Sequence, residues 1–218
     1  GDEYAGEWLK EQAKKKNYKV LIKNSTDQIN NLSLQGPNSR KILEKFIFTP
    51  PTQPTISELQ WFRFTICRID NLNGIPLIVS RTGYTGELGW ELYIPTEMAV
   101  SVYDKIIEEG KVHGLKHCGY HTLNSLRIEK AYREWAHDMG PRETLLEAGL
   151  SFTCDWDKPE GFVGKEALVA QKEKGPINTR LVQFLLEDSG PILSHNESIL
   201  CDGECMAAIG FIKGVECI

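Results

Sequence analysis

The sequence lacks several features that define common protein classes. No apolar run approaches the ~20 residues that a membrane-spanning helix requires, and the N-terminal Gly-Asp-Glu-Tyr is not a charged-then-apolar leader. There is no Cys-x-x-Cys pair and no Gly-x-Gly-x-x-Gly fingerprint. We therefore expect no membrane span, no export signal, no cysteine-based zinc domain and no dinucleotide-binding unit in this chain.

An excess of positive charge is also missing. Against 25 Lys and Arg stand 30 Asp and Glu, for a formal net charge of −5, which argues against a general nucleic-acid binder. Hydrophobic residues make up 41% and charged residues 25% of the chain, as in ordinary soluble globular proteins. At 218 residues the chain is long enough to bury a sizeable core.

Metal-binding and disulfide patterns are weak. His113, His117 and His121 recur every four residues, but Gly114 and Gly119 interrupt any helix that would align them, so we expect no metal site. The cysteines follow no framework spacing, and those at positions 67, 118 and 154 lie in apolar stretches, which favours buried thiols in a reducing compartment. The other three are Cys201, Cys205 and Cys217.

Hydrophobic periodicity predicts a mixture of helices and strands. An Asn-Gly pair at 73–74 predicts a tight hairpin turn between residues 61 and 79. Thr96 is the predicted cap of a helix through about Gly110, with Met98, Val102 and Ile106 on one face. The fold class expected from this order is α+β. Further helices are predicted at residues 4–16, 35–46, 120–135 and 162–174, and strands at 18–22, 29–34, 90–94, 146–152 and 180–186.

Residues 81–93, R-T-G-Y-T-G-E-L-G-W-E-L-Y, combine a glycine-punctuated loop with an alternating strand. Glu91 alternates with apolar neighbours and so faces either water or a cavity. In a cavity it can accept two parallel hydrogen bonds from an amino-pyrimidine edge, and Tyr84 would add a flat wall. The alternative is an ordinary solvated turn.

The same stretch, together with residues 125–132 (S-L-R-I-E-K-A-Y), 146–150 (L-E-A-G-L) and 162–168 (F-V-G-K-E-A-L), resembles the folate-binding region of the sarcosine and dimethylglycine dehydrogenase family. That region is shared with the aminomethyltransferase, or T-protein, of the glycine cleavage system. The resemblance runs from about residue 8 to residue 180. It implies a partial T-protein-like folate-binding domain over residues 1–175 and the incomplete start of a small C-terminal β-barrel over residues 176–218.

The resemblance also implies site residues. Tyr84 and Glu91 would contact tetrahydrofolate, with Glu87 and Arg127 as secondary candidates. Arg127 has three possible roles. It is a surface residue whose apolar stem lies along the protein, a structural residue, or a contact to the folate tail. Leu123 stands where some T-proteins have a folate-binding arginine, so that contact should be absent. The aspartate that assists proton transfer in the family would precede residue 1, which leaves no catalytic residue in this chain.

The implied parent enzyme oxidises sarcosine or dimethylglycine at FAD, held in a flavin domain outside this chain, and passes the one-carbon unit to tetrahydrofolate as 5,10-methylenetetrahydrofolate. This chemistry belongs to choline degradation and one-carbon metabolism. Sarcosine is the preferred amine, and this chain alone is expected to be inactive. Its expected location is the mitochondrial matrix in a eukaryote or the cytoplasm in a bacterium. The alternatives are a free-standing aminomethyltransferase, against which Lys130 and Trp135 count, and a non-catalytic relative such as the regulatory subunit of pyruvate dehydrogenase phosphatase.

Overall fold

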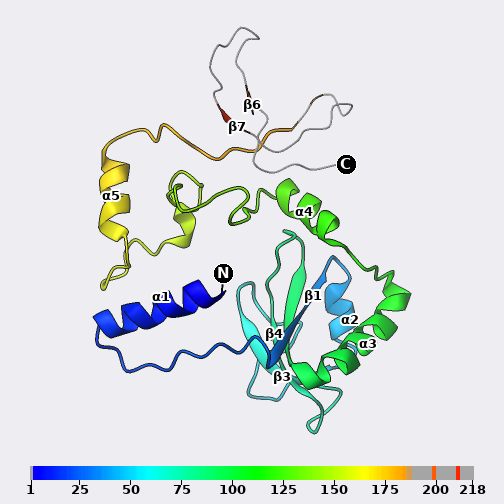
Figure 1. The fold of residues 1–218 in the computed structure, drawn as a ribbon. Coiled ribbons are helices and arrows are strands. Elements are labelled where there is room, and N and C mark those ends of the chain that lie inside the picture. The colour runs from blue at the N-terminus through cyan, green and yellow to red at the C-terminus, as the bar shows by residue number, and fades with distance from the viewer. Residues whose placement is uncertain (1, 186, 188–197, 200–209, 212–218) are drawn as a thin grey trace. The chain divides into compact units, whose positions relative to one another are not determined.

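The computed structural model describes residues 2–185, 187, 198–199 and 210–211. The chain divides into two compact units (Figure 1). The first, here called the sheet unit, comprises residues 1–83 and 87–117, and the second, the loop unit, comprises residues 84–86 and 118–218. The glycine-rich stretch at residues 81–93 is thus divided between the two units.

A five-stranded antiparallel sheet in the order β1-β5-β4-β3-β2 forms the centre of the sheet unit. The predicted strand at 29–34 is confirmed as β1 and the strand that follows the loop is confirmed as β5. In the register Leu32 pairs with Leu92, and Glu91 lies between Ser33 and Ser80. The strands are β1 (Ile29–Gln35), β2 (Ile47–Phe48), β3 (Phe64–Ile69), β4 (Pro76–Ser80) and β5 (Gly89–Pro95).

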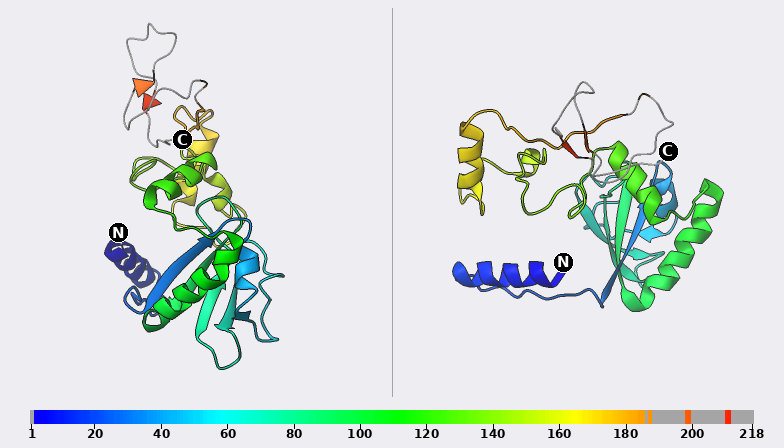
Figure 2. Two further views of the ribbon diagram at one scale, coloured as in Figure 1. Left: turned by 90° about the vertical axis from the view of Figure 1, so that its right-hand side faces the viewer. Right: turned by 45° about the horizontal axis from the view of Figure 1, so that its top comes forward.

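Alternation along the strands gives the sheet two different faces. One face is apolar and buried beneath α2 (Ser39–Leu43) and α3 (Ala99–Gly110), which lie together beside the sheet (Figures 1 and 2). The other face is more exposed and alternates in sequence with the first. The core on the buried side consists of Leu34, Ile42, Leu43, Phe46, Ile56, Leu59, Cys67, Ile69, Leu77, Val79, Trp90, Leu92, Ile94, Val102 and Ile106.

The start of α3 differs from the prediction. Residues Thr96–Met98 form a short 3-10 helix, η1, and the N-cap of α3 is Met98, without a side-chain capping bond. Val102 and Ile106 are buried as expected, whereas Met98 is exposed. The helix is anchored by its apolar face rather than by the hydroxyl of Thr96, because burial of two branched side chains outweighs one cap.

The predicted hairpin is confirmed by the antiparallel pairing of β3 with β4, but its turn is wider than a two-residue loop. The positive φ of this turn belongs to Asp70, at 62°, and not to Gly74. Gly74 is needed for a close approach instead, since a Cβ there would lie 1.7 Å from the carbonyl oxygen of Ile69.

The N-terminal segment bears out the predicted helix but not the strand after it. Helix α1 runs from Asp2 to Lys15 with Lys14 and Lys15 in its last turn, where cations suit the helix dipole. Residues 18–22 form no strand, and Tyr18, Val20 and Leu21 are exposed. The prediction for this run was wrong because β-branched composition cannot make a strand without a neighbouring edge to pair with.

The loop unit contains little regular structure among its described residues. Helix α4 (Tyr120–Glu129) ends six residues earlier than predicted, and Ala131 then takes a positive φ of 55°. Residues 146–152 form turns that lead into η3 (Ser151–Thr153) instead of the predicted strand, and residues 180–185 are not a strand either. Helix α5 (Lys165–Glu173) confirms the last predicted helix in shortened form.

The strands β6 (Ser198–Ile199) and β7 (Gly210–Phe211) pair antiparallel. Whether they begin a C-terminal barrel, and whether a domain boundary lies at residue 175, stay predictions. No helix among the described residues is long and apolar enough to cross a membrane.

The cysteine prediction is only partly right. Cys67 is buried in β3, whereas Cys154 is half-buried and Cys118 is exposed, against expectation. Cys118 is the first residue of the loop unit's main segment, directly after the sheet unit ends at His117. The other three cysteines lie outside the described residues.

Candidate functional site

Two of the loop's glycines allow the chain to pass close to the side chain of Gln35. An added Cβ at Gly83 or Gly89 would lie 2.1 Å and 1.6 Å, respectively, from Gln35 Oε1. The Gln35 amide donates to Thr82 O at 3.4 Å and to Trp90 O at 3.3 Å. A side chain at either position would displace the amide end of Gln35, which ties β1 to the loop that precedes β5.

Glu91 lies on the more exposed face of the sheet, with its side chain half-buried. The Tyr93 hydroxyl donates a 2.7 Å hydrogen bond to Glu91 Oε2. This bond is the main reason that the pKa of Tyr93 is raised, and burial adds to it. Tyr93 therefore stays protonated as a donor, and its phenol holds the carboxylate in one orientation.

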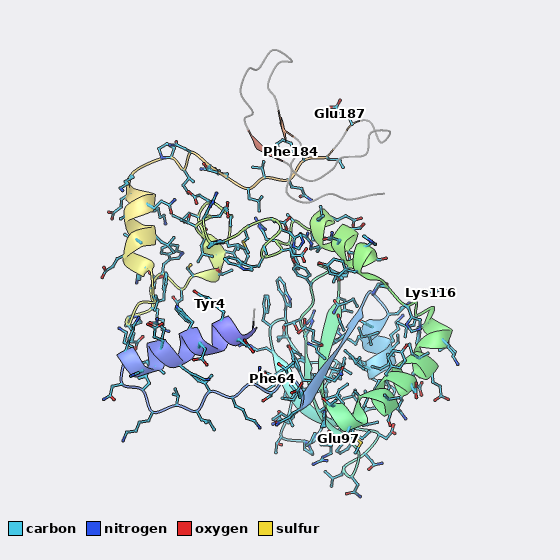
Figure 3. The ribbon with its side chains drawn as sticks, in the orientation of Figure 1. Tyr4, Phe64, Glu97, Lys116, Phe184 and Glu187 are labelled. Carbon is cyan, nitrogen blue, oxygen red and sulfur yellow. The ribbon has the colours of Figure 1, made fainter. Side chains whose placement is uncertain are left out.

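The apolar part of the same face consists of β3 and β4 side chains. Phe64, Ile66 and Ile78 are exposed to 59%, 51% and 38%, and Phe64 is labelled in Figure 3. Because Ser80 pairs with both Phe64 and Glu91, these three residues lie side by side on one face of the sheet, so the carboxylate is next to the apolar side chains. The face offers one anionic acceptor beside aromatic and aliphatic surface.

A cavity of about 380 Å³ lies in the loop unit, and Tyr84 forms part of its wall. The Tyr84 hydroxyl donates to Arg133 O at 2.5 Å, and the rings of Tyr84 and Tyr132 lie 6.0 Å apart. Burial is the largest cause of a raised pKa for Tyr84, which nearby Arg127 partly offsets. The complete lining is Tyr84, Lys130, Tyr132, Arg133, Met139, Leu150 and Phe152.

Arg133 fixes the wall by binding main-chain carbonyls. Its guanidinium donates to Ala131 O at 2.5 Å, to Ala148 O at 3.0 Å and to Gly149 O at 3.4 Å. These contacts join the segment after α4 to the turn before η3. Irregular backbone is thereby held in place without a ladder of strand hydrogen bonds.

Arg127 is only 2% exposed, which excludes the surface role. Its guanidinium forms ion pairs with Asp138 and, at 3.0 Å, with Glu134. It also donates to Asn124 Oδ1 at 2.7 Å and to Tyr132 O at 3.0 Å. These contacts hold the segment that carries Tyr132, Arg133 and Met139 in place, and the predicted contact of Arg127 to the folate tail stays a prediction.

The acidic partners are in turn held by their own donors. Asp138 Oδ2 accepts the backbone N–H of Glu134 at 2.7 Å, and the Tyr120 hydroxyl donates to Glu134 Oε1 at 2.5 Å. The latter bond raises the pKa of Tyr120. A buried cation with satisfied acidic partners is stable, whereas loss of one member leaves an uncompensated charge.

The sequence-predicted residues therefore fall into different places. Tyr84 lines the cavity of the loop unit, while Glu91 belongs to the sheet unit and is not among the lining residues. Glu87 is exposed. Within the described residues, no three His, Cys, Asp or Glu side chains gather into a metal-binding group.

Sequence reasoning missed most of the cavity wall. Lys130, Tyr132 and Arg133 lie in the segment that directly follows α4, and an aromatic residue flanked by cations there was the available signal. Met139, Leu150 and Phe152 gave no comparable signal, because they come from segments without periodicity.

The sequence matches the family described as the GCVT N-terminal domain over residues 1–158. It is 43% identical over 200 residues to the trimethylamine-oxide aldolase of Ruegeria pomeroyi, covering 91% of this chain and 25% of that protein. It is 39% identical over 197 residues to human mitochondrial dimethylglycine dehydrogenase, covering 90% of this chain and 22% of the relative.

An aminomethyltransferase of Thermoanaerobacter pseudethanolicus is 38% identical over 207 residues, covering 94% of this chain and 52% of the relative. The crystal structure of the glycine cleavage system aminomethyltransferase T from Bartonella henselae matches 68% of this chain and 37% of its own, with a TM-score of 0.54 and 24% identity. This likeness supports the fold of mixed helices and antiparallel sheet.

The chain spans about a quarter to a half of the length of these curated relatives. The three curated relatives named above all have the names of enzymes. The family match covers the glycine-rich loop, the five-stranded sheet and the residues that line the cavity. The chain therefore belongs to the family of aminomethyltransferase-like GCVT N-terminal domains.

Proposed function

We propose that this chain is the tetrahydrofolate-binding part of a larger enzyme, in which it captures a one-carbon unit from an N-methyl amine as 5,10-methylenetetrahydrofolate. The observation that carries this proposal is the Glu91 carboxylate, half-buried and oriented by Tyr93 on the more exposed face of the sheet. An oriented carboxylate is the acceptor that the amino-pyrimidine edge of a pterin requires.

The contribution of this chain to the reaction is positioning. Glu91, in the sheet unit, would accept hydrogen bonds from the pterin. Tyr84, in the loop unit, stays a predicted tetrahydrofolate contact. Capture of a reactive one-carbon unit depends mainly on holding its acceptor nearby in the right orientation. General acid–base help, typically worth about 10²–10⁴-fold, would come from a residue outside this chain.

The amine is an N-methylated compound in this proposal. Dimethylglycine and trimethylamine oxide stand in the names of two relatives, and both carry N-methyl groups. Sarcosine has the same chemistry and remains a candidate. The location, mitochondrial matrix or bacterial cytoplasm, is likewise a proposal.

FAD does not fit the residues present here. The chain has no Gly-x-Gly-x-x-Gly turn to hold a flavin diphosphate. We assign oxidation of the amine to a flavin domain elsewhere in the longer protein and derive no step of it here.

A free-standing aminomethyltransferase is the second candidate, favoured by the larger share of that relative that the chain covers, 52%. Both candidates use the same folate site. They separate on the source of the one-carbon unit, an oxidised amine in the first and an aminomethyl group carried by another protein in the second.

Calorimetric titration with tetrahydrofolate tests the proposed site. Glu91→Gln keeps the size and one acceptor but removes the charge, so affinity should fall by about 10- to 100-fold, which corresponds to a charge-assisted hydrogen bond. The control is Glu97→Gln, on an exposed residue of the sheet unit that is labelled in Figure 3. Unchanged affinity in Glu91→Gln would contradict the assignment.

A further inference from the structure

A row of polar side chains crosses the more exposed face of the sheet. In the strand register Glu91 lies between Ser33 on β1 and Ser80 on β4, and Tyr93 lies opposite Asn31 on β1. Side chains directly opposite one another on antiparallel strands are near enough to interact. Glu91 is half-buried, and both of its cross-strand neighbours are short serines. The carboxylate therefore lies in polar surroundings on a face that a ligand can reach.

Asn31 and Glu91 hold the phenol of Tyr93 between them. The Tyr93 hydroxyl donates to Glu91 Oε2 at 2.7 Å. That bond is the main reason that the pKa of Tyr93 is raised, and a side-chain hydrogen bond with Asn31 acts in the opposite direction. A hydrogen bond lowers the pKa of a phenol when it is donated to the phenol oxygen, because it favours the charged form. The Asn31 amide thus donates to Tyr93, and Tyr93 donates to Glu91.

The phenol fixes the plane of the carboxylate. An ionised carboxylate offers about four lone-pair sites on its two oxygens, and Tyr93 uses one of them. The last torsion of a glutamate is broad, so without this bond the two oxygens can turn. A ligand with one N–H donor needs one oxygen and tolerates that freedom. A ligand with two adjacent, parallel N–H donors needs both oxygens in one plane.

From this arrangement we infer that Tyr93 is a specificity-determining positioning residue, which fixes the Glu91 carboxylate so that the site prefers a ligand edge with two adjacent N–H donors to an edge with one. The inference rests on the proposed function and adds how the site selects its ligand. The 2-amino group and ring N3–H of tetrahydrofolate form such an edge. Asn31, Tyr93 and Glu91 all belong to the sheet unit, so this selection needs no contact from the loop unit.

The test compares two ligands that differ in one donor. They are tetrahydrofolate and its analogue with hydrogen in place of the 2-amino group, which keeps the ring N3–H. Calorimetry with the full chain gives both dissociation constants, and their ratio is the preference. Tyr93→Phe keeps the ring and removes the hydroxyl, while Asn31→Ala removes the side chain that holds the phenol. The control is Tyr103→Phe, which removes a hydroxyl on α3 that lies 3.5 Å from His117 Nδ1.

For the wild-type chain we expect a preference of about 10- to 100-fold for tetrahydrofolate, the value of one hydrogen bond to a charged acceptor. Tyr93→Phe should reduce this preference by about 3- to 10-fold, because the ligand must then order the carboxylate itself. Affinity for the analogue should change by less than about 2-fold, since one donor needs only one oxygen. Asn31→Ala should act in the same direction with a smaller effect, and Tyr103→Phe should keep the full preference.

A purely structural role for Tyr93 would weaken both ligands equally and leave the preference unchanged, and that result would overturn the inference. A wild-type chain that binds both ligands equally would overturn it too. Because Asn31 is exposed, Asn31→Ala keeps the test decisive if Tyr93→Phe does not fold. An unchanged preference in Asn31→Ala would then count against the inference.

The same titrations separate this inference from the proposed function. If the wild-type chain bound neither ligand, the proposed function would be overturned, and the inference about Tyr93 with it. If Glu91→Gln weakened tetrahydrofolate binding as expected but Tyr93→Phe left the preference intact, only the inference would be lost.

Discussion

The two units of this chain bury different kinds of side chain. The core of the sheet unit is a cluster of fifteen hydrophobic residues between the sheet and two helices. In the described part of the loop unit the buried residues are Thr85, Arg127, Asp138 and Ala148. One unit is organised by apolar surface and the other by a buried cation with its acidic partners.

This difference affects how each unit tolerates change. Apolar burial contributes about 25 cal/mol per Å² and is spread over many contacts, so it declines gradually as side chains are trimmed. A buried ion pair depends on every member, because one charge left alone is strongly unfavourable. The unit with the candidate cavity should therefore be more sensitive to a single polar substitution than to the loss of a methyl group.

The largest predicted effect is that of Arg127→Met. It leaves Asp138 and Glu134 without their cation, and we expect the free energy of unfolding to fall by about 3–5 kcal/mol. Urea titration gives the total loss. Hydrogen exchange should show it first in the backbone amides of residues 120–150, with the sheet amides better protected.

The matched control for Arg127→Met is the double variant Arg127→Met/Asp138→Asn. The asparagine keeps an acceptor for the Glu134 N–H but carries no charge. This variant should recover part of the lost stability. A loss of under ~1 kcal/mol in Arg127→Met, the value of an exposed pair, would show that Arg127 is not buried as described.

The next largest predicted effect concerns Cys67, a thiol in the apolar core of the sheet unit. Burial raises the pKa of Cys67 to about 12, whereas an unfolded cysteine titrates near ~8.5. The raised value means that the neutral thiol stabilises the fold fully below pH ~8.5 and that this contribution is lost as pH rises toward the folded pKa. Cys67 should then cost about 1.4 kcal/mol for each pH unit above ~8.5.

Unfolding free energies of wild type and Cys67→Ala, measured from pH 8 to pH 11, check this prediction. The alanine variant should show the shallower decline, and Cys118→Ala should decline like wild type because Cys118 is exposed. Parallel curves for wild type and Cys67→Ala would mean that the thiol is accessible to solvent.

The smallest predicted effect has the opposite sign. Ala131 and Ala136, in the loop unit, have φ values of 55° and 71°, in the left-handed region. Glycine accepts this conformation without the Cβ clash, so Ala131→Gly and Ala136→Gly should each raise the free energy of unfolding by about 0.5–1 kcal/mol. Thermal unfolding measures the change.

Ala148→Gly is the matched control, since Ala148 is buried in the same unit without a positive φ. It should lower stability, because glycine there only adds chain entropy to the unfolded state and removes a packed methyl group. Destabilisation by Ala131→Gly and Ala136→Gly of similar size would show that neither backbone is strained.

Local pattern predicted the sheet unit better than the loop unit. The alternation around Trp90, Leu92 and Ile94 correctly gave a strand with Glu91 on the opposite face, because each side chain's face follows from the pleat alone. The predicted strands at 18–22 and 146–152 are not strands in the structure, because the same local pattern does not show what a strand pairs with. A strand needs a partner edge, and sequence does not show whether one is present.

For the candidate site, the sequence by itself determined the glycine-rich loop, the orientation of Glu91 and the family resemblance that singled out Tyr84. Only the tertiary structure decided that Arg127 is buried, that its partner is Asp138 eleven residues along the chain, and that Lys130 lies against Gly86. The physical reason is that period and propensity act between near neighbours, whereas ion pairing and cavity walls depend on which irregular segments the fold brings together.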